Sequence, residues 1–353
     1  MNRFFQTQKE TISEFLTDFL RDNIPDVSRV SHWGSDTMER LLGFTIQGKM
    51  LRGGLLMLGY RLSGGMIDQD ALPAAAAMEL FQSSFLVHDD IMDRDSLRRG
   101  KPTVFWQYKT LAEKGGLSDP YHAGESLGLC AGDISFFLGF ELLSRICARN
   151  CTAGGLLSFC AREITYVGLA QMEDVWFGYA KELPSEETVL SLYTYKTGRY
   201  TFSMPLMAGA LIAGRTIPEL SILSKLGEKL GVIFQIKDDE LGLFGDEKEL
   251  GKPVGSDLKE GKKTPYAIAL FREAKDGERE RLLKIFGNPD ITPADVRFVQ
   301  ELAGKLGIRE RLAKRMEALA AETRSLIASL ADCDVEALRV LTEFVEYNLS
   351  RSK

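Results

Sequence analysis

The stretch from Glu79 to Thr103 constrains the fold of this chain most strongly. It reads ELFQSSFLVHDDIMDRDSLRRGKPT, and Asp89 and Asp93 lie four residues apart in it. On a helix this spacing places both carboxylates on one face, about 6 Å apart along the axis, with Asp90 beside them. At an effective dielectric near 20, two ionised carboxylates about 5 Å apart repel each other by roughly 3 kcal/mol. A divalent cation removes this repulsion, and carboxylate oxygens suit Mg2+, which often bridges to a substrate phosphate.

Two arginines, Arg98 and Arg99, follow this acidic group. Guanidinium groups clamp phosphate oxygens, so an acidic face followed by basic residues is typical of a magnesium–diphosphate site. The competing interpretation is a helix end or a solvated face, where acidic clusters are more often found. The apolar residues Phe85, Leu86 and Val87 lead directly into the motif and argue against a plain exposed face.

A second acidic stretch runs from Phe234 to Thr264 and reads FQIKDDELGLFGDEKELGKPVGSDLKEGKKT. Gln235, Asp238 and Asp239 share one helical face at spacings of three and four,. A glycine- and lysine-rich loop follows, and it carries Lys252, Lys262 and Lys263. Two acidic faces, each followed by basic residues, are expected to meet across one cavity and hold a diphosphate through bridging metal ions.

Composition limits the class of protein. The chain has 353 residues, 44% of them hydrophobic, which is enough for a large buried core,. Helical periodicity dominates and alternating strand patterns are scarce, so we expect an all-α protein. No linker, low-complexity run or solenoid repeat interrupts it, so a single domain over residues 1–353 is expected. The net charge of −6 disfavours nucleic acid as a partner, and the local basic clusters therefore indicate a small anionic ligand,.

The cysteines form no CxxC pair and no zinc-ligand spacing. They are Cys130, Cys147, Cys151, Cys160 and Cys333. A reducing cytoplasm is the simplest setting for these thiols. No signal-peptide core is seen at the N-terminus, and no segment is seen to approach the roughly 20 apolar residues of a membrane span. We therefore expect no stable membrane anchor.

Local patterns place several helices. One is expected from near Asp70 to Asp93, with Pro73 tolerated in its first turn. Residues 107–122 contain two glycines and a proline and are predicted to be a surface loop,. Residues 124–148 carry few charges and are predicted to be a long apolar helix,.

The two ends of the chain are also predicted to be helical. Apolar residues recur at helical spacing near the N-terminus, at Phe5, Ile12, Phe15, Leu16 and Phe19. This helix is expected to pack on the body rather than on lipid, because its polar face is not basic. Further along, Pro205 is expected to kink its helix. Helix starts are predicted at Thr292 and after Asp334.

Three further cationic side chains suit a phosphate ligand. Lys49 and Arg52 lie three apart on one face at the turn into an apolar helix, although a solvated basic edge explains them equally well,. Gln82 lies two helical turns before Asp89 on nearly the same face, where a buried glutamine is usually a hydrogen-bonded core residue. Lys196 lies in a mostly apolar helix, where a buried charge needs a partner, and a diphosphate is a good one,.

At these residues the chain resembles a trans-isoprenyl diphosphate synthase of the polyprenyl synthetase family, over about residues 40 to 270. DDIMD followed by LRRGKPT resembles the first aspartate-rich motif of the family, and FQIKDD with LGKPVGSDLKEGKKT resembles the second. The resemblance implies a single-domain isoprenoid synthase-type helical bundle around a deep central cavity. The helices of residues 275–353 would belong to the same body. It also implies a homodimer, for which residues 124–148 could supply the interface.

The implied activity is Mg2+-dependent head-to-tail condensation of isopentenyl diphosphate with an allylic diphosphate (dimethylallyl, geranyl or farnesyl). The implied metal ligands are Asp89, Asp90, Asp93, Asp238 and Asp239. The implied contacts to isopentenyl diphosphate are Lys49, Arg52, Gln82 and Arg99. The other implied substrate contacts are Arg98, Lys196, Thr197, Phe234, Gln235, Lys252 and Lys262. The residues expected to act in catalysis are Asp89, Asp93, Asp238, Lys196 and Arg98.

Product length is expected to depend on the residues before Asp89. Each buried methylene stabilises the bound chain by ~0.8 kcal/mol, so a barrier must stop its growth. Phe85 and Phe81 lie four and eight residues before Asp89, with the small Ser84 between them. Phe85 would restrict the depth of the pocket and Ser84 would relieve it. We expect a short all-trans product, geranylgeranyl diphosphate, with farnesyl diphosphate as the alternative.

One position departs from the family pattern. Many relatives carry a third aspartate in the second motif, where this chain has Gly242. Asp238 is then expected to be the main ligand of that motif, with Asp239 in support and a lower metal affinity.

Other classes share parts of this pattern. A class I terpene cyclase shares the first motif, but its usual second site, Asn/Asp–Asp–x–x–Ser–x–x–x–Glu, does not occur here. A non-catalytic partner subunit of a prenyl synthase would tend to lose aspartates, and this chain keeps both pairs. A calcium-binding module is disfavoured because the sequence has no DxDxDG loop,.

Overall fold

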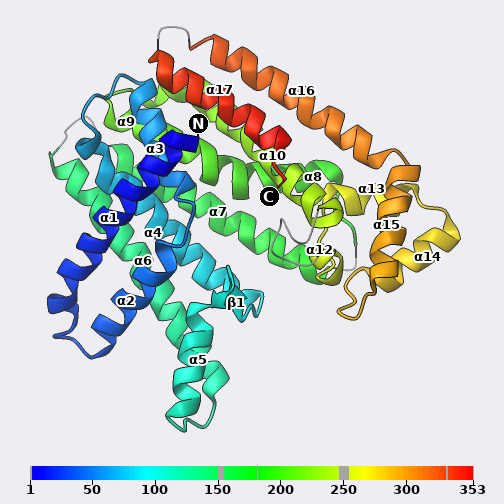
Figure 1. The fold of residues 1–353 in the computed structure, drawn as a ribbon, viewed down its shortest axis with the longest axis horizontal. Helices are drawn as coiled ribbons and strands as arrows, with labels where there is room; N and C mark the ends of the chain where they lie inside the picture. Colours follow the sequence, from blue (N-terminus) through cyan, green and yellow to red (C-terminus); the bar gives the residue numbers. More distant parts are fainter. Residues whose placement is uncertain (1, 150–154, 181, 246–253, 331–332, 353) are drawn as a thin grey trace. The chain divides into compact units, whose positions relative to one another are not determined.

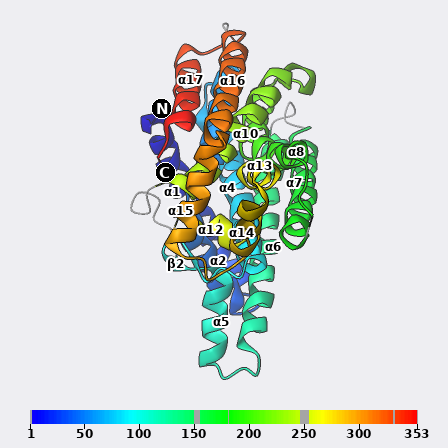
Figure 2. The same cartoon turned by 90° about the vertical axis from the view of Figure 1, so that its right-hand side faces the viewer.

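The computed structural model describes residues 2–149, 155–180, 182–245, 254–330 and 333–352. The chain divides into two compact units, Met1–Phe159 with Pro205–Ile217 and Cys160–Met204 with Pro218–Lys353. Both units are built from helices (Figure 1, Figure 2), which confirms the predicted all-α class. The single domain expected from the sequence stays a prediction.

Among the described residues, the first unit contains six helices that lie wholly within it, a small hairpin and one late segment. The helices are α1 (Asn2–Val27), α2 (Trp33–Thr45), α3 (Leu51–Leu62), α4 (Asp68–Met92), α5 (Val104–Lys114) and α6 (Pro120–Arg149). The hairpin pairs β1 (Leu97–Arg98) antiparallel to β2 (Lys101–Pro102). The late segment is α9 (Met204–Ile212), of which all but the first residue belongs to this unit.

Helix α1 packs on its own unit through one apolar stripe. Ile12, Leu16, Phe19 and Leu20 are buried, and α1 contacts α2, α3 and α4. Burying an aliphatic or aromatic side chain stabilises a fold by roughly 1.5–3 kcal/mol. The predicted amphipathic N-terminal helix and its packing on the body are therefore confirmed.

Helices α4 and α6 make the most extensive helix pair of the first unit. Alanines 74–77 and Leu80 on α4 are fully buried, and the small alanine side chains allow close approach of neighbouring helices,. The long apolar helix predicted over residues 124–148 is confirmed as part of α6.

The expectation that no segment approaches a membrane span is wrong for α6. Over Pro120–Cys147 this helix is long and apolar enough to cross a membrane, by length and composition alone. Gly132, Asp133 and Ser135 interrupt its apolar runs. The sequence therefore shows no unbroken apolar stretch of about 20 residues, although the mean hydropathy of the helix is high. A core helix of a water-soluble protein passes the same test, and 44% of the most apolar window is buried, so one such helix is weak evidence for a membrane span.

The central helix of the second unit is α10. Its elements are α7 (Leu156–Tyr179, the first residues of which belong to the first unit), α8 (Glu186–Tyr193), η2 (Thr194–Ser203), η3 (Ile217–Leu220), α10 (Ser221–Phe244), α12 (Ser256–Lys259), α13 (Pro265–Glu273), α14 (Asp276–Ile285), α15 (Pro293–Lys305), α16 (Ile308–Ala328) and α17 (Val335–Ser350). Helices α16 and α17 lie side by side in both views (Figure 1, Figure 2), and both contact α10.

Segment η2 is a π-helix, which differs from the kink predicted at Pro205. Its wide turns end at Ser203, and α9 begins at the next residue, Met204. Proline lacks the amide hydrogen that would continue a regular ladder, and π-turns of this kind often mark functional sites. A Cβ on Gly231 would lie 2.1 Å from the Cα of Gly198, so two glycines are needed where α10 crosses η2. This close approach places the two segments that carry Lys196 and Asp238 in direct contact.

Two predicted helix starts are confirmed by their caps. The Thr292 side chain accepts a hydrogen bond from the amide of Asp295, and the Asp295 carboxylate accepts one from the amide of Thr292. The Asp334 side chain accepts from the amide of Ala337 at 2.7 Å. These caps satisfy amides that have no partner within the helix.

Two predicted boundaries are wrong. The expected loop over residues 107–122 is mostly helical, because α5 continues to Lys114 and α6 begins at Pro120. Only the short link around Gly116 turns, and its φ of +66° suits glycine,. Helix α4 begins at Asp68 rather than near Asp70, so Pro73 lies in its second turn.

Candidate functional site

The first acidic motif lies at the C-terminal end of α4. The amide of Asp93 donates to the carbonyl of Asp89 at 2.8 Å, so the helical spacing predicted for this pair is confirmed. Asp93 is the residue that ends the helix and is exposed, whereas Asp89 is half-buried. Two carboxylates one turn apart are thus presented at the surface of the first unit, where a cation can reach them.

Asp90 is turned into the protein. It is fully buried, and its Oδ1 accepts a 2.6 Å hydrogen bond from Nε of Arg98 on β1. Burial raises the pKa of Asp90 to about 7, although the charge and the hydrogen bond of Arg98 lower it. Its Oδ2 is buried and finds no hydrogen-bond partner among the described residues. Arg98, predicted as a diphosphate ligand, is therefore an ion-pair partner of the motif.

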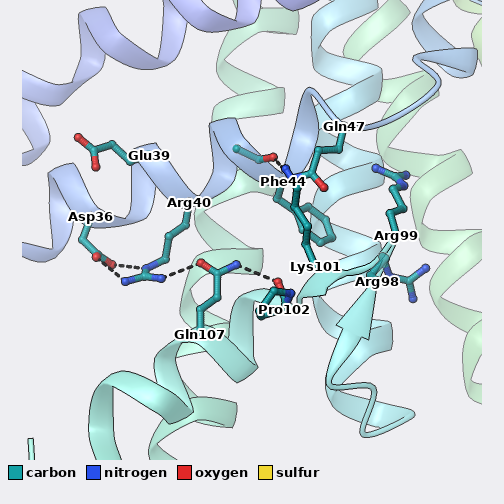
Figure 3. A pocket seen from close by; sticks show the side chains of 11 residues that line it. Asp36, Glu39, Arg40, Phe44, Gln47, Arg98, Arg99, Lys101, Pro102 and Gln107 are labelled. Atoms are coloured by element: carbon teal, nitrogen blue, oxygen red, sulfur yellow. Dashed lines mark hydrogen bonds and ion pairs between the residues drawn. The ribbon is translucent and has the colours of Figure 1, made fainter. Parts of the chain in front are cut away.

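The hairpin that follows α4 carries a left-handed pair of residues. Arg99 has a φ of +54° and Gly100 a φ of +74°. This conformation costs energy for a residue with a side chain, and such strain is often found at functional sites. The turn sends Arg98 and Arg99 in different directions (Figure 3). A Cβ at Gly48 would lie 3.6 Å from Nη1 of Arg99, which places this guanidinium at the loop before α3.

A cavity of about 520 Å³ opens beside this hairpin (Figure 3). Its lining comes from α2 and the loop after it, the hairpin, and α5, and includes Gln47, Arg98, Arg99, Lys101 and Gln107. Arg40 forms one wall, where it pairs with Asp36 at 2.8 Å and donates to Gln107 at 2.7 Å. The sequence offered no signal for this cavity beyond its arginines.

The loop before α3 corrects the geometry expected of Lys49 and Arg52. Lys49 lies outside α3, and Met50 has a left-handed φ of +51°. The two side chains therefore do not share a helical face, although both stand at the start of the helix. Because the amides at a helix start are oriented towards anions, this end of α3 still suits a phosphate.

A buried carboxylate supports this helix start. Oε1 of Glu79 accepts a 2.7 Å hydrogen bond from the amide of Gly53. Burial raises the pKa of Glu79, while this bond and the charges of Arg52 and Arg99 lower it. Glu79 lies three residues before the half-buried Gln82 on α4. This helical spacing could have identified Glu79 in the sequence as a polar residue on the same face as Gln82.

The residues predicted to control chain length face α6. Phe81 is fully buried, with its ring centroid 4.9 Å from that of Phe140, and Phe85 lies 4.9 Å from Phe136. Ser84 is fully buried between them in sequence, and its hydroxyl has no partner among the described residues. Phe81 and Phe85 therefore belong to an aromatic cluster shared by α4 and α6, and their control of chain length stays a prediction.

The second acidic motif lies near the C-terminal end of α10. Asp238 is half-buried, and its Oδ1 lies 3.4 Å from Nη2 of Arg351. Asp239 is buried and accepts from the Tyr193 hydroxyl at 2.7 Å and from Nε2 of Gln235 at 3.3 Å. Burial raises the pKa of Asp239 well above its usual range, and the Tyr193 bond opposes this shift.

The lysine of η2 has a protein partner in the second unit. Nζ of Lys196 pairs with Oδ2 of Asp174 on α7, so the predicted need for an anionic partner is met by a carboxylate. Thr197 donates from its hydroxyl to Oε1 of Gln235 at 3.1 Å. Both side chains are half-buried, and this contact ties η2 to the second acidic motif.

The absent third aspartate has a structural explanation. A Cβ on Gly242 would lie 2.7 Å from Oδ2 of Asp257, so the Asp257 carboxylate occupies the space that a side chain there would take. Lys262, one of the predicted substrate contacts, lies 3.6 Å from Asp257 and 2.8 Å from Glu260. Lys252 lies outside the described residues.

Comparison with known proteins decides the family. The model of the polyprenyl synthetase family matches residues 35–303. The chain belongs to this family. It is a short-chain trans-isoprenyl diphosphate synthase, a prenyltransferase, which sets aside the terpene cyclase and the calcium-binding module.

Related polyprenyl synthetases match 72% to 97% of this chain in three examples. A geranylgeranyl diphosphate synthase of Sulfolobus acidocaldarius is 31% identical over 97% of both chains. A short chain isoprenyl diphosphate synthase of Methanocaldococcus jannaschii is 36% identical over 72% of both. A geranylgeranyl pyrophosphate synthase of Corynebacterium glutamicum, solved with isoprenyl diphosphate and magnesium, superposes with a TM-score of 0.87 at 28% identity, over 97% of this chain and 98% of the other. The predicted isoprenoid synthase fold is confirmed.

The carboxylates of this polyprenyl synthetase fit the divalent metal ion that the family uses. Among the described residues, no three His, Cys, Asp or Glu side chains form a ready metal cage. Mg2+ is usually held by one or two carboxylates together with waters and substrate phosphates, so a full cage is not required. Asp89 with Asp93 in the first unit, and Asp238 in the second, offer such donors. The buried Oδ2 of Asp90, which has no partner among the described residues, is a further hard oxygen donor.

Proposed function

We propose that this synthase makes geranylgeranyl diphosphate by Mg2+-dependent head-to-tail condensation of isopentenyl diphosphate with an allylic diphosphate. The observation that carries this proposal is the aromatic cluster of Phe81, Phe85, Phe136 and Phe140 behind the first aspartate motif. The fully buried ring of Phe81 and the half-buried ring of Phe85, eight and four residues before Asp89, would stop the chain early. The Sulfolobus acidocaldarius relative, named a geranylgeranyl diphosphate synthase, supports the same product.

Asp89, Asp93 and Asp238 would hold Mg2+, with Asp90 and Asp239 in support. When bound, the metal stabilises the charge that develops on the leaving diphosphate. The residues needed for this step are expected to converge on one diphosphate, as the sequence predicts.

Cationic side chains would bind the allylic diphosphate. Lys196 can exchange the Asp174 carboxylate for a phosphate oxygen, because the pair is only partly buried,. Arg98 and Lys252 would add positive charge. Each preorganised donor of this kind is worth about 10²–10³ in rate.

The allylic cation that forms must be kept from water and from nucleophiles. The ring of Phe234 can stabilise it through its π-face, and the Gln235 amide through its dipole. Lys49, Arg52, Gln82 and Arg99 would hold isopentenyl diphosphate while its double bond attacks. The proton lost at the end can pass to the departed diphosphate, so no side-chain base is required.

An assay of the purified full chain tests the function. Incubation with Mg2+, isopentenyl diphosphate and farnesyl diphosphate should give linear geranylgeranyl diphosphate on chromatography, with geranyl and dimethylallyl diphosphates as alternative primers. Lys196→Gln should lower kcat/KM for the allylic substrate about 10²-fold. Lys229→Gln, which alters an ion pair with Glu322, is the matched control. A farnesyl product from dimethylallyl diphosphate would support the alternative synthase. A cyclic hydrocarbon or no turnover would contradict the proposal.

We also propose that the protein is a homodimer through α6. Leu129, Ile134 and Phe137 of this helix are exposed, Phe137 by 75%. A second copy would remove these apolar surfaces from water. Light scattering should give the mass of a dimer, and Phe137→Glu should give a monomer, whereas Leu111→Glu on α5 should not. A dimeric Phe137→Glu variant would exclude this face.

The proposed location is the reducing cytoplasm, and the cysteine spacing supports it, because the sequence contains no CxxC pair,. Cys130 on α6 is a free thiol. Cys151 lies outside the described residues.

A further inference from the structure

The last residues described by the structure reach the second acidic motif. Arg351 follows α17, and its amide donates to the Tyr347 carbonyl at 2.9 Å. Its Nη2 donates to the Phe234 carbonyl at 2.9 Å and lies 3.4 Å from Oδ1 of Asp238. The guanidinium carbon lies 3.9 Å from the centre of the Phe234 ring. These contacts all lie within the second unit.

Arg351 is built into the fold and is not a loose surface tail. Its side chain is only 5% exposed, against 46% for Asp238. The helix before it is anchored by Phe344, whose ring lies 5.9 Å from that of Phe202. A guanidinium buried to this degree requires anionic or dipolar partners, and here the Phe234 carbonyl and the Asp238 carboxylate supply them.

We propose that Arg351 is the resident counter-cation of Asp238 and that it competes with the divalent metal ion for this carboxylate. The inference rests on the proposed function, in which Asp238 is a metal ligand. A divalent ion on Asp238 would face the guanidinium at close range, and two like charges repel strongly in a partly buried site. The metal must therefore displace Arg351 or bind against its charge.

The same displacement would act on Phe234. The guanidinium covers a face of the ring that the proposed mechanism assigns to the allylic cation. An arginine that leaves when the metal binds would expose this ring and the Phe234 carbonyl at the same moment. Arg351 is thus a positioning residue: whether a metal ion occupies Asp238 would decide whether the Phe234 ring is covered or exposed.

Binding of Mn2+ alone to the full chain, followed by electron paramagnetic resonance without substrate, tests this inference. Asp238→Asn identifies the part of the titration that belongs to this carboxylate. Arg351→Gln should tighten that part about three- to tenfold, because one nearby positive charge is removed from a partly exposed site. Arg351→Lys, which keeps the charge, should bind Mn2+ more weakly than Arg351→Gln.

Arg339→Ala is the matched control, since Arg339 lies on α17 and pairs there with Glu336 and Glu343. It should leave Mn2+ binding unchanged. Equal or weaker binding by Arg351→Gln would overturn the inference. An unaltered titration in Asp238→Asn would instead show that the metal role of Asp238 is wrong. Thermal unfolding followed by circular dichroism checks that the variants fold, and Mn2+ should raise the Tm of Arg351→Gln more than that of the unmodified protein.

Discussion

The hydroxyl of Tyr193 donates a 2.7 Å hydrogen bond to Oδ2 of Asp239, 46 residues further along the chain. Both side chains are buried, and Asp239 also accepts a hydrogen bond from Nε2 of Gln235 at 3.3 Å. A buried carboxylate without donors is costly, so this bond stabilises the acidic end of α10. It also leaves Asp238, and not Asp239, as the accessible carboxylate of the second motif.

Tyr193→Phe should therefore destabilise the protein without disturbing its packing. Removing the hydroxyl leaves a buried acceptor poorly satisfied, which costs about 1–3 kcal/mol of unfolding free energy. Urea denaturation followed by circular dichroism measures this. Tyr195→Phe, at an exposed ring in η2, should cost little. Equal stability of the two variants would show that the Asp239 bond contributes nothing.

Glu79→Gln should remove a pH dependence of stability. Burial raises the pKa of Glu79 above its ordinary value of 4.5, so the folded state binds this proton more tightly than the unfolded state does. The stability contributed by Glu79 is complete below pH 4.5 and is lost as the pH rises through the folded pKa, with a slope of at most about 1.4 kcal/mol per pH unit,.

Unfolding free energies of the two proteins at pH 5 and pH 8 check this prediction. The value for Glu79→Gln minus that for the unmodified protein should become more positive at the higher pH. Glu280→Gln, at an exposed side chain of α14, should show no such change. A difference that does not vary with pH would mean that Glu79 titrates as it does in the unfolded chain.

Gly242→Asp should weaken the fold even though many relatives carry aspartate there. Its Cβ would meet the Asp257 carboxylate at 2.7 Å, and its charge would repel that group,. Because the Asp257 carboxylate ends a flexible side chain and can move aside, charge repulsion is the main cost, and we expect a loss of about 1 kcal/mol,. A double variant with Asp257→Ala should recover part of the stability, which a double-mutant cycle in urea quantifies. Additive losses would indicate that the two positions do not compete for one space.

Phe81→Ala should lengthen the prenyl product, because removing the ring opens the aromatic cluster towards Phe140. Chromatography of the products from farnesyl diphosphate measures this. A buried Phe→Ala change costs about 3–5 kcal/mol, so Phe105→Ala, at another fully buried ring, controls for lost stability,. Gly139→Ala should act in the opposite direction, since its Cβ would lie 2.6 Å from the Phe81 ring. An unchanged product profile in both variants would place the barrier elsewhere.

Much of the helical frame could be predicted because it is encoded locally. The caps at Thr292 and Asp334 need side chains three residues or fewer from the amides they bind,. The same holds for Asp89 and Asp93, since one turn of helix places both carboxylates on one face whatever surrounds them. The loop predicted over residues 107–122 was wrong because residues that favour helix lie there among glycines and a proline that favour turns. The two local signals disagreed.

The partners of the charged residues were decided by tertiary structure alone. Lys196 meets Asp174, Asp90 meets Arg98, and Arg351 meets Asp238, 113 residues away in the chain. No spacing rule predicts such pairs, because they depend on which helices pack together and how closely glycines let them approach. By itself the sequence determined the family, the helices and the two acidic faces, since these follow from local geometry and residue chemistry. Only packing decided which carboxylates are buried, which remain accessible to a metal ion, and which cation holds each of them.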